Sequence, residues 1–185
     1  MSEIILRPAT PADAAAIAQV RIDSWRTTYK GMIPDAYLAA MKVDESAALW
    51  EKILTAGPNA TSVFVAADAN GIVGFAAGNM LAEPKHGLNA ELSAVYLVHA
   101  AQRAGIGQRL VATVAAAQRA HGATGLIAWV IAGNKAARAF YEKLGAELLI
   151  EQAFTWDGME LIEVGYGWRN LDALVASVNL PAMLH

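Results

Sequence analysis

Apolar residues and their spacing divide the chain into short strands and amphipathic helices. Residues 91–98 are rich in Leu, Val, Tyr and Ala without regular polar alternation, which is typical of a strand buried on both faces. Residues 108–121 form an Ala-rich segment in which Leu110, Val111 and Val114 have helical spacing. The pattern therefore predicts a central buried strand, a short glycine-containing turn and a long helix.

The segments before this unit carry both strand and helix patterns. Thr10 is a favoured helix N-cap and Pro11 a favoured first helical residue, so a helix is expected to begin there. Asn70-Gly71 lies between two β-prone runs and predicts a hairpin turn. The predicted elements are a strand over residues 4–6, a helix over about 11–27, a helical stretch in one or two pieces over about 35–55, strands over 62–67 and 72–80, and a loop over 81–88.

The segments after the long helix continue the alternation. A strand is predicted over residues 125–131 and a helix over 134–144, with Gly145 in the position that commonly ends a helix. Strands over 147–155 and 159–168 are predicted to form a last hairpin, turned at Asp157-Gly158. Beyond this hairpin, Leu171, Leu174, Val175 and Val178 have helical spacing, which predicts a short helix in the tail. Packing of that helix on its own body is favoured slightly over packing on a second copy in a homodimer.

Composition limits the classes of protein that the chain can belong to. With 185 residues, 56% hydrophobic and 17% charged, it is expected to fold as a single domain with a sizeable core. A net charge of −3 argues against nucleic-acid binding. The absence of cysteine excludes a disulfide framework, a cysteine nucleophile and a thiolate metal site. No other metal-ligand spacing, signal region or membrane-spanning run is found, so a cytoplasmic protein without a metal or a membrane partner is expected.

The turn before the long helix carries the first candidate chemistry. Between His99 and Arg109 there is no Ser, Thr, Asp or Asn to cap the first free N–H groups of the helix. These groups, the positive end of the helix dipole and the side chains of Arg103 and Arg109 suit a bound anion such as phosphate. The alternative is a helix start that is capped by water.

The spacing Gln102-x-x-Gly105-x-Gly107 after a buried strand resembles the pyrophosphate-binding loop of the GNAT superfamily of acyl-CoA-dependent N-acetyltransferases. The predicted order of elements is also the GNAT order, over about residues 4–169. The resemblance implies an α/β (α+β) fold with a mixed, largely antiparallel seven-stranded sheet flanked by helices. It further implies one acyltransferase domain over residues 1–185, in which 170–185 form a C-terminal extension.

A second segment, Asn134-Lys-Ala-Ala-Arg-Ala-Phe-Tyr141-Glu-Lys-Leu-Gly145, resembles the family's Asn-x-x-Ala-x-x-Phe-Tyr-x-x-x-Gly segment. Ala146 stands where the family commonly has Phe, and Ala100-Ala101 replaces a common Pro-x-Tyr. The resemblance implies that Asn134 binds the pantetheine arm and that Tyr141 faces the thioester sulfur. The alternatives are an ordinary N-cap for Asn134 and a core position for Tyr141. The residues expected to contact acetyl-CoA are Tyr96, Leu97, Val98, Arg103, Ala104, Gly105, Ile106, Gly107, Gln108, Asn134 and Tyr141.

Acyl transfer to an amine requires a base, hydrogen-bond donors for the carbonyl oxygen and an acid for the leaving thiolate. Main-chain N–H groups at residues 96–98 are the expected donors, because the family separates this strand from its neighbour here. Tyr141 is the expected acid, since a phenol pKa of roughly 10 is close to a thiol pKa of roughly 8.5. Glu91 matches the position of a catalytic glutamate in some family members, but it is equally well explained as a solvated carboxylate.

The acceptor is expected to contact Trp25 and Tyr29. Residues 25–34 resemble a Trp-Arg-x-x-Tyr-x-Gly-x-Ile-Pro segment of one bacterial GNAT group, in which this region walls the acceptor pocket. Trp156 is a further candidate for that wall. The alternative is that Trp25 and Tyr29 anchor the first helix to the sheet.

These observations favour an N-acetyltransferase that moves an acetyl group from acetyl-CoA to a primary amine of a small molecule. Without a cysteine to carry the acyl group, direct attack in a ternary complex is the simplest scheme. The alternatives are an acetyltransferase of protein N-termini or lysines, and a non-catalytic module that binds coenzyme A.

Overall fold

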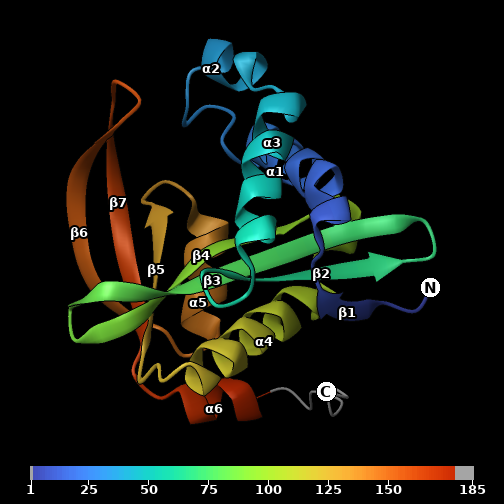
Figure 1. Cartoon of the computed structure of the whole chain (residues 1–185). Helices are drawn as coiled ribbons and strands as arrows, with labels where there is room; N and C mark the ends of the chain where they lie inside the picture. Colours follow the sequence, from blue (N-terminus) through green and yellow to red (C-terminus); the bar gives the residue numbers. More distant parts are fainter. Residues whose placement is uncertain (1, 178–185) are drawn as a thin grey trace.

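A computed structural model of the chain describes residues 2–177. Its centre is a seven-stranded sheet with the strand order β1-β2-β3-β4-β5-β7-β6 (Figure 1). The strands are β1 (Ile5–Pro8), β2 (Ser62–Asp68), β3 (Gly71–Lys85), β4 (Leu88–Leu97), β5 (Leu126–Ile131), β6 (Glu147–Trp156) and β7 (Met159–Trp168). Neighbouring strands are antiparallel except for β4 and β5, which are parallel. This arrangement confirms the predicted fold class.

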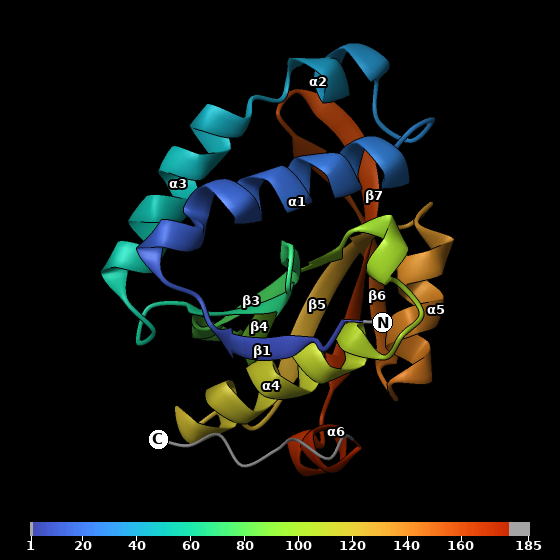
Figure 2. The same cartoon turned by 90° about the vertical axis from the view of Figure 1, so that its right-hand side faces the viewer.

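Helices cover both faces of the sheet. They are α1 (Ala14–Thr28), α2 (Asp35–Ala40), α3 (Val43–Ala56), α4 (Ile106–Ala120), α5 (Lys135–Lys143) and α6 (Leu171–Ala176). Figure 2 shows α1 and α3 on one side of the sheet and α4 on the other. The core is accordingly divided in two: Ile17 and Phe75 belong to the half under α1 and α3, whereas Leu110 and Tyr166 belong to the half under α4 and α5.

Most predicted elements are present, with shifted boundaries. The second helical stretch consists of two helices, because Met41 and Lys42 have extended torsions between α2 and α3. Helix α4 begins at Ile106 rather than at residue 108, and β4 begins at Leu88 rather than at residue 91.

The loop predicted over residues 81–88 is wrong. Strand β3 continues to Lys85, which pairs with Leu88 across a tight turn. His86 and Gly87 form this turn, and both have positive φ angles, of 51° and 79°. The pairing is irregular between Met80 and Lys85, and the end of the strand is exposed. The sequence pattern did not indicate a strand here, because this exposed end contains Pro84 and polar side chains instead of an apolar run.

The tail helix packs on the body of its own chain, as favoured from the sequence. Leu171 and Leu174 of α6 are buried in the core half that contains α4. Arg119 near the end of α4 donates to Asp172 at 2.7 Å. Val178, which belongs to the predicted helical pattern, lies outside the described residues. None of the described helices is long and apolar enough to cross a membrane.

Candidate active site

Strands β4 and β5 meet at one end and separate at the other. Only Ala90 with Leu126 and Glu91 with Ile127 are paired between them. Beyond these two pairs β4 stays paired with β3 as far as Leu97, while β5 stays paired with β7 along its whole length. The sheet is therefore split from Leu92 onwards, and the split opens toward the start of α4.

Strand geometry decides which amides of β4 face the split. The Val98 N–H donates to the Val73 carbonyl of β3 at 2.9 Å. Because N–H groups alternate sides along an antiparallel strand, the Tyr96 N–H faces β3 and the Leu97 and Val95 N–H groups face the split. Of the donors expected at residues 96–98, the Leu97 N–H faces the split, whereas the Tyr96 and Val98 N–H groups face β3. The Val95 N–H also faces the split. It was not among the donors expected from the sequence, although strand alternation counted from Leu97 would have indicated it.

The turn between β4 and α4 leaves backbone N–H groups free. Arg103 and Gly105 both have left-handed torsions, with φ of 65° and 77°. Gly105 is the N-cap of α4 and no side chain caps it, as predicted. The first helical bond runs from the Arg109 N–H to the Gly105 carbonyl at 3.2 Å, so the N–H groups of residues 106–108 have no partner in the helix. Arg103 and Ala104 are exposed beside them.

The two glycines of this turn have different roles. Gly105 has no neighbour that a Cβ would meet, so its positive φ is what requires glycine there. At Gly107 a Cβ would lie 3.2 Å from Phe140 Cζ and 3.3 Å from Leu97 Cδ1. Gly107 thus allows the start of α4 to pack closely against α5 and the end of β4.

Tyr141 occupies a core position and still presents its hydroxyl. Its ring packs against Tyr166 and Trp168, with centroid separations of 6.0 and 5.5 Å. The hydroxyl makes no hydrogen bond to another described residue. It keeps some exposure, because fully buried side-chain atoms without a partner are limited to Gln118 Oε1 among the described residues. Burial, together with the nearby phenols of Tyr96 and Tyr29, raises the pKa of Tyr141 above its usual value. The hydroxyl therefore stays protonated over the physiological pH range, and its pKa is further from that of a thiol than the sequence argument assumed.

Asn134 has the N-cap role that the sequence left open. Its Oδ1 accepts a hydrogen bond from the Ala137 N–H at 3.1 Å, and the residue is 7% exposed. Burial, together with the nearby phenol of Tyr96, raises the pKa of Tyr29 to about 12, and the Asn134 side chain opposes that rise. Asn134 thus lies close to Tyr29, the residue that ends α1.

An aromatic cluster joins α1 to the sheet beside the split. The Trp25 Nε1–H donates to the Tyr96 hydroxyl at 3.0 Å, which is the anchoring contact considered from the sequence. Trp25 also packs on Tyr29 and Trp156 at 4.7 and 5.0 Å between ring centroids. Tyr37 of α2 lies against Trp156 and was missed, because nothing in its own segment indicates that it meets the last hairpin.

Glu91 lies where the split begins. Its neighbours Ala90 and Leu92 are buried in the α4 half of the core, so the Glu91 side chain lies on the opposite face of the sheet. Burial raises the pKa of the half-buried Glu91 carboxyl, Lys85 opposes the shift and Glu163 adds to it. A carboxylate with a raised pKa is a better proton acceptor near neutral pH than a solvated one.

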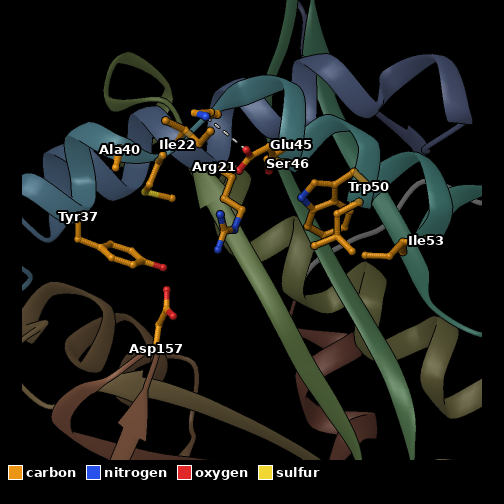
Figure 3. A pocket seen from close by; sticks show the side chains of 12 residues that line it. Arg21, Ile22, Tyr37, Ala40, Glu45, Ser46, Trp50, Ile53 and Asp157 are labelled. Atoms are coloured by element: carbon orange, nitrogen blue, oxygen red, sulfur yellow. Dashed lines mark ion pairs between the residues drawn. The ribbon is translucent and has the colours of Figure 1, made fainter.

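A cavity of about 470 Å³ adjoins the aromatic cluster on the α1 face (Figure 3). Its walls come from α1, from α2, from α3 and from the turn of the last hairpin. The lining includes Arg21, Tyr37, Glu45, Trp50 and Asp157. Trp50 contacts Phe75, which in turn contacts Tyr96 at the split. Within residues 2–177 no group of three His, Asp or Glu side chains is placed to hold a metal ion.

A split mixed sheet with an uncapped helix at its open end defines an acyltransferase fold. The model of the Acetyltransferase (GNAT) family matches residues 21–146, and the chain belongs to this family. It is therefore an enzyme of the acyltransferase class.

Similar proteins align with this chain over most of its length. The uncharacterized N-acetyltransferase YuaI of Bacillus subtilis is 37% identical over 177 residues, covering 95% of this chain and 99% of YuaI. The PaiA N-acetyltransferase of Thermoplasma acidophilum, solved with coenzyme A, superposes with a TM-score of 0.66 at 19% identity over 88% of this chain and 98% of PaiA. For yncA of Salmonella typhimurium, solved with its cofactor acetyl-CoA, the TM-score is 0.64 at 20% identity over 89% of this chain and 92% of yncA.

Proposed function

We propose that this enzyme transfers the acetyl group of acetyl-CoA to a primary amine of a small molecule, by direct attack within a ternary complex. One observation carries the proposal: β4 parts from β5 beside the uncapped start of α4. This places outward amides of β4 next to free N–H groups of the helix. The solved PaiA and yncA structures, which hold coenzyme A and acetyl-CoA, support acetyl-CoA as the co-substrate.

The cofactor contacts follow the chain from the turn into the split. The diphosphate of acetyl-CoA binds the N–H groups of residues 104–108, and the exposed guanidinium of Arg103 adds a positive charge. The pantetheine arm extends along β4 between Leu97 and the amide of Asn134. This route brings the thioester carbonyl to the outward N–H groups of Leu97 and Val95.

The transfer step uses groups on both sides of the split. The amine nitrogen attacks the thioester carbon, and the negative charge that develops on the carbonyl oxygen is met by the main-chain donors. The C–S bond then breaks, and Tyr141 donates its proton to the leaving sulfur. The high pKa of Tyr141 keeps the phenol protonated until that moment, and solvent restores the proton afterwards.

Glu91 removes the proton of the attacking amine through water. Glu91 and Val95 are four residues apart on β4, which is roughly 13 Å along an extended strand. A carboxylate at that separation needs a chain of water molecules to reach the reacting nitrogen. The raised pKa of Glu91 suits a base that works near neutral pH.

A small amine is favoured over a protein acceptor by the cavity beside the split. Its volume of about 470 Å³, between three helices and the turn of the last hairpin, fits a small molecule better than an extended peptide. A non-catalytic module is disfavoured because Tyr141 keeps an unpaired hydroxyl and Glu91 a raised pKa.

Thiol release from acetyl-CoA with a panel of primary amines tests the proposal. We expect release that depends on the amine, together with binding of acetyl-CoA in a calorimetric titration. Binding without release for any amine would leave the non-catalytic module. A protein substrate acetylated far faster than every small amine would make the acceptor a protein.

A further inference from the structure

Arg21 lies in the middle of α1 and extends into the cavity (Figure 3). Its guanidinium carbon is 4.7 Å from the centre of the Trp25 ring. None of the hydrogen bonds or salt bridges between described side chains includes Arg21. Stacking on Trp25 holds the guanidinium in place and leaves its N–H donors free for a ligand.

The acidic side chains of the same cavity have other partners. Glu45 pairs with Lys42 at 3.5 Å, and both side chains are well exposed at the rim. The Asp157 carboxylate lies beside Tyr37, and burial together with this carboxylate raises the Tyr37 pKa. Figure 3 shows the Tyr37 hydroxyl and the Asp157 carboxylate directed toward each other. Arg21 and Asp157 are therefore the two charges of the cavity that form no salt bridge with a described residue, and Arg21 is the one of the two that can bind an anion.

Most of the remaining wall is apolar. Ile22, Leu49, Trp50 and Ile53 form much of the lining. Such a surface accepts a hydrocarbon or aromatic body, while a planar guanidinium with several donors matches a carboxylate in bidentate fashion.

The cavity also lies close to the proposed reaction centre. Trp25, on which Arg21 stacks, donates to the Tyr96 hydroxyl at 3.0 Å. Burial raises the pKa values of Tyr29 and Tyr96, and the positive charge of Arg21 opposes both shifts. Arg21 is thus connected to the split through Trp25 and Tyr96.

We propose that Arg21 binds a carboxylate on the acceptor, so that the acceptor class is a small amine bearing both a carboxylate and an apolar body. That this cavity binds the acceptor rests on the proposed acetyl transfer, whereas the affinity of Arg21 for a carboxylate does not. Carboxylate binding and acetyl transfer can therefore be tested separately.

The kinetic test compares amines that differ only in the carboxylate. Phenylalanine and phenethylamine form one such pair, and 6-aminohexanoate and pentylamine form another. We expect Arg21→Gln to lower kcat/KM for the amino acids roughly tenfold to a hundredfold, mostly by raising KM. This range corresponds to the usual contribution of a hydrogen bond to a charged group. The values for the amines without a carboxylate and the KM for acetyl-CoA are expected to change little. Arg21→Lys keeps the charge but not the fork, so an intermediate loss is expected.

Lys52→Gln is the matched control, because Lys52 is an exposed cation on α3 outside the cavity. A direct binding readout uses 3-phenylpropionate, which has the carboxylate and the ring but no amine to acetylate. Protein-detected NMR is expected to show that 3-phenylpropionate binds to the wild type and to Lys52→Gln but not to Arg21→Gln. The melting temperature of Arg21→Gln is expected to equal that of the wild type, which shows that the variant is folded. Equal losses for both members of each pair, or equal binding of 3-phenylpropionate to wild type and Arg21→Gln, would overturn the inference. If 3-phenylpropionate binds through Arg21 while no amine is acetylated, the carboxylate site stands and the proposed transfer fails.

Discussion

Removal of the Tyr141 hydroxyl gives the sharpest test of the proposed chemistry. Tyr141→Phe deletes one oxygen and keeps the ring that packs on Tyr166 and Trp168. Because this hydroxyl makes no hydrogen bond to a described residue, the free energy of unfolding is expected to change by no more than about 0.5 kcal/mol. General acid catalysis contributes roughly 10²–10⁴-fold, so kcat is expected to fall at least about a hundredfold.

The assay follows release of coenzyme A with a thiol reagent at saturating amine. The chain contains no cysteine, so every thiol that the reagent detects comes from the reaction. The KM for acetyl-CoA is expected to stay within about twofold, since the groups proposed to bind its diphosphate and its pantetheine arm are unchanged. Tyr166→Phe is the control, because Tyr166 is a second buried phenol and its hydroxyl is already hydrogen-bonded to Glu142 and Arg138. A Tyr141→Phe enzyme with wild-type kcat, or an equal loss of kcat in Tyr166→Phe, would refute the role of Tyr141 as the acid.

Three further changes test other parts of the molecule. Gly105→Ala places a Cβ on a residue with a φ of 77°, so it is expected to weaken acetyl-CoA binding and to destabilise the fold by about 1–2 kcal/mol. Gly105→Asn should have smaller effects, because Asn tolerates left-handed torsions better than Ala. Calorimetry measures the binding of acetyl-CoA, and thermal melting measures the stability. Glu91→Gln is expected to remove the acid limb of the kcat/KM–pH profile, because the wild-type base is lost as pH falls through its raised pKa; an unchanged profile would place the base elsewhere. Arg7 lowers the pKa of Asp13, so this pair stabilises the fold above the unfolded Asp pKa of roughly 3.9 and loses that effect as pH falls through the lower folded pKa. The stability difference between wild type and Asp13→Asn should therefore be full at pH 7 and shrink on acidification below about pH 4, and a constant difference would contradict the assignment.

Local patterns were sufficient to predict most of the fold. The buried run that became β4, the uncapped glycine turn and the helix after it were recognisable because each depends on residues close together in sequence. The end of β3 could not be found in this way. Its residues 81–85 are mostly exposed, so pairing with β4, rather than burial, holds them in the sheet.

The candidate site was predictable only in part, for a related reason. Tyr141 and Asn134 belong to a recognisable segment, and the structure places them beside the split. Arg21 and Tyr37 belong to no such segment. They line one cavity with Asp157 only because α1, α2 and the last hairpin converge, and that convergence is a property of tertiary packing. The direction of the Val98 amide likewise depends on its partner Val73 in another strand.

The two pairs that join β4 to β5 have a mechanical consequence. Strands β1 to β4 form one antiparallel slab and β5 to β7 form another, and the backbone bonds between the slabs are confined to Ala90–Leu126 and Glu91–Ile127. The backbone ladder therefore contributes little to the angle between the slabs. That angle is held by the buried side chains that pack across the joint, among them Leu92 of β4 and Val130 of β5, which belong to one core cluster.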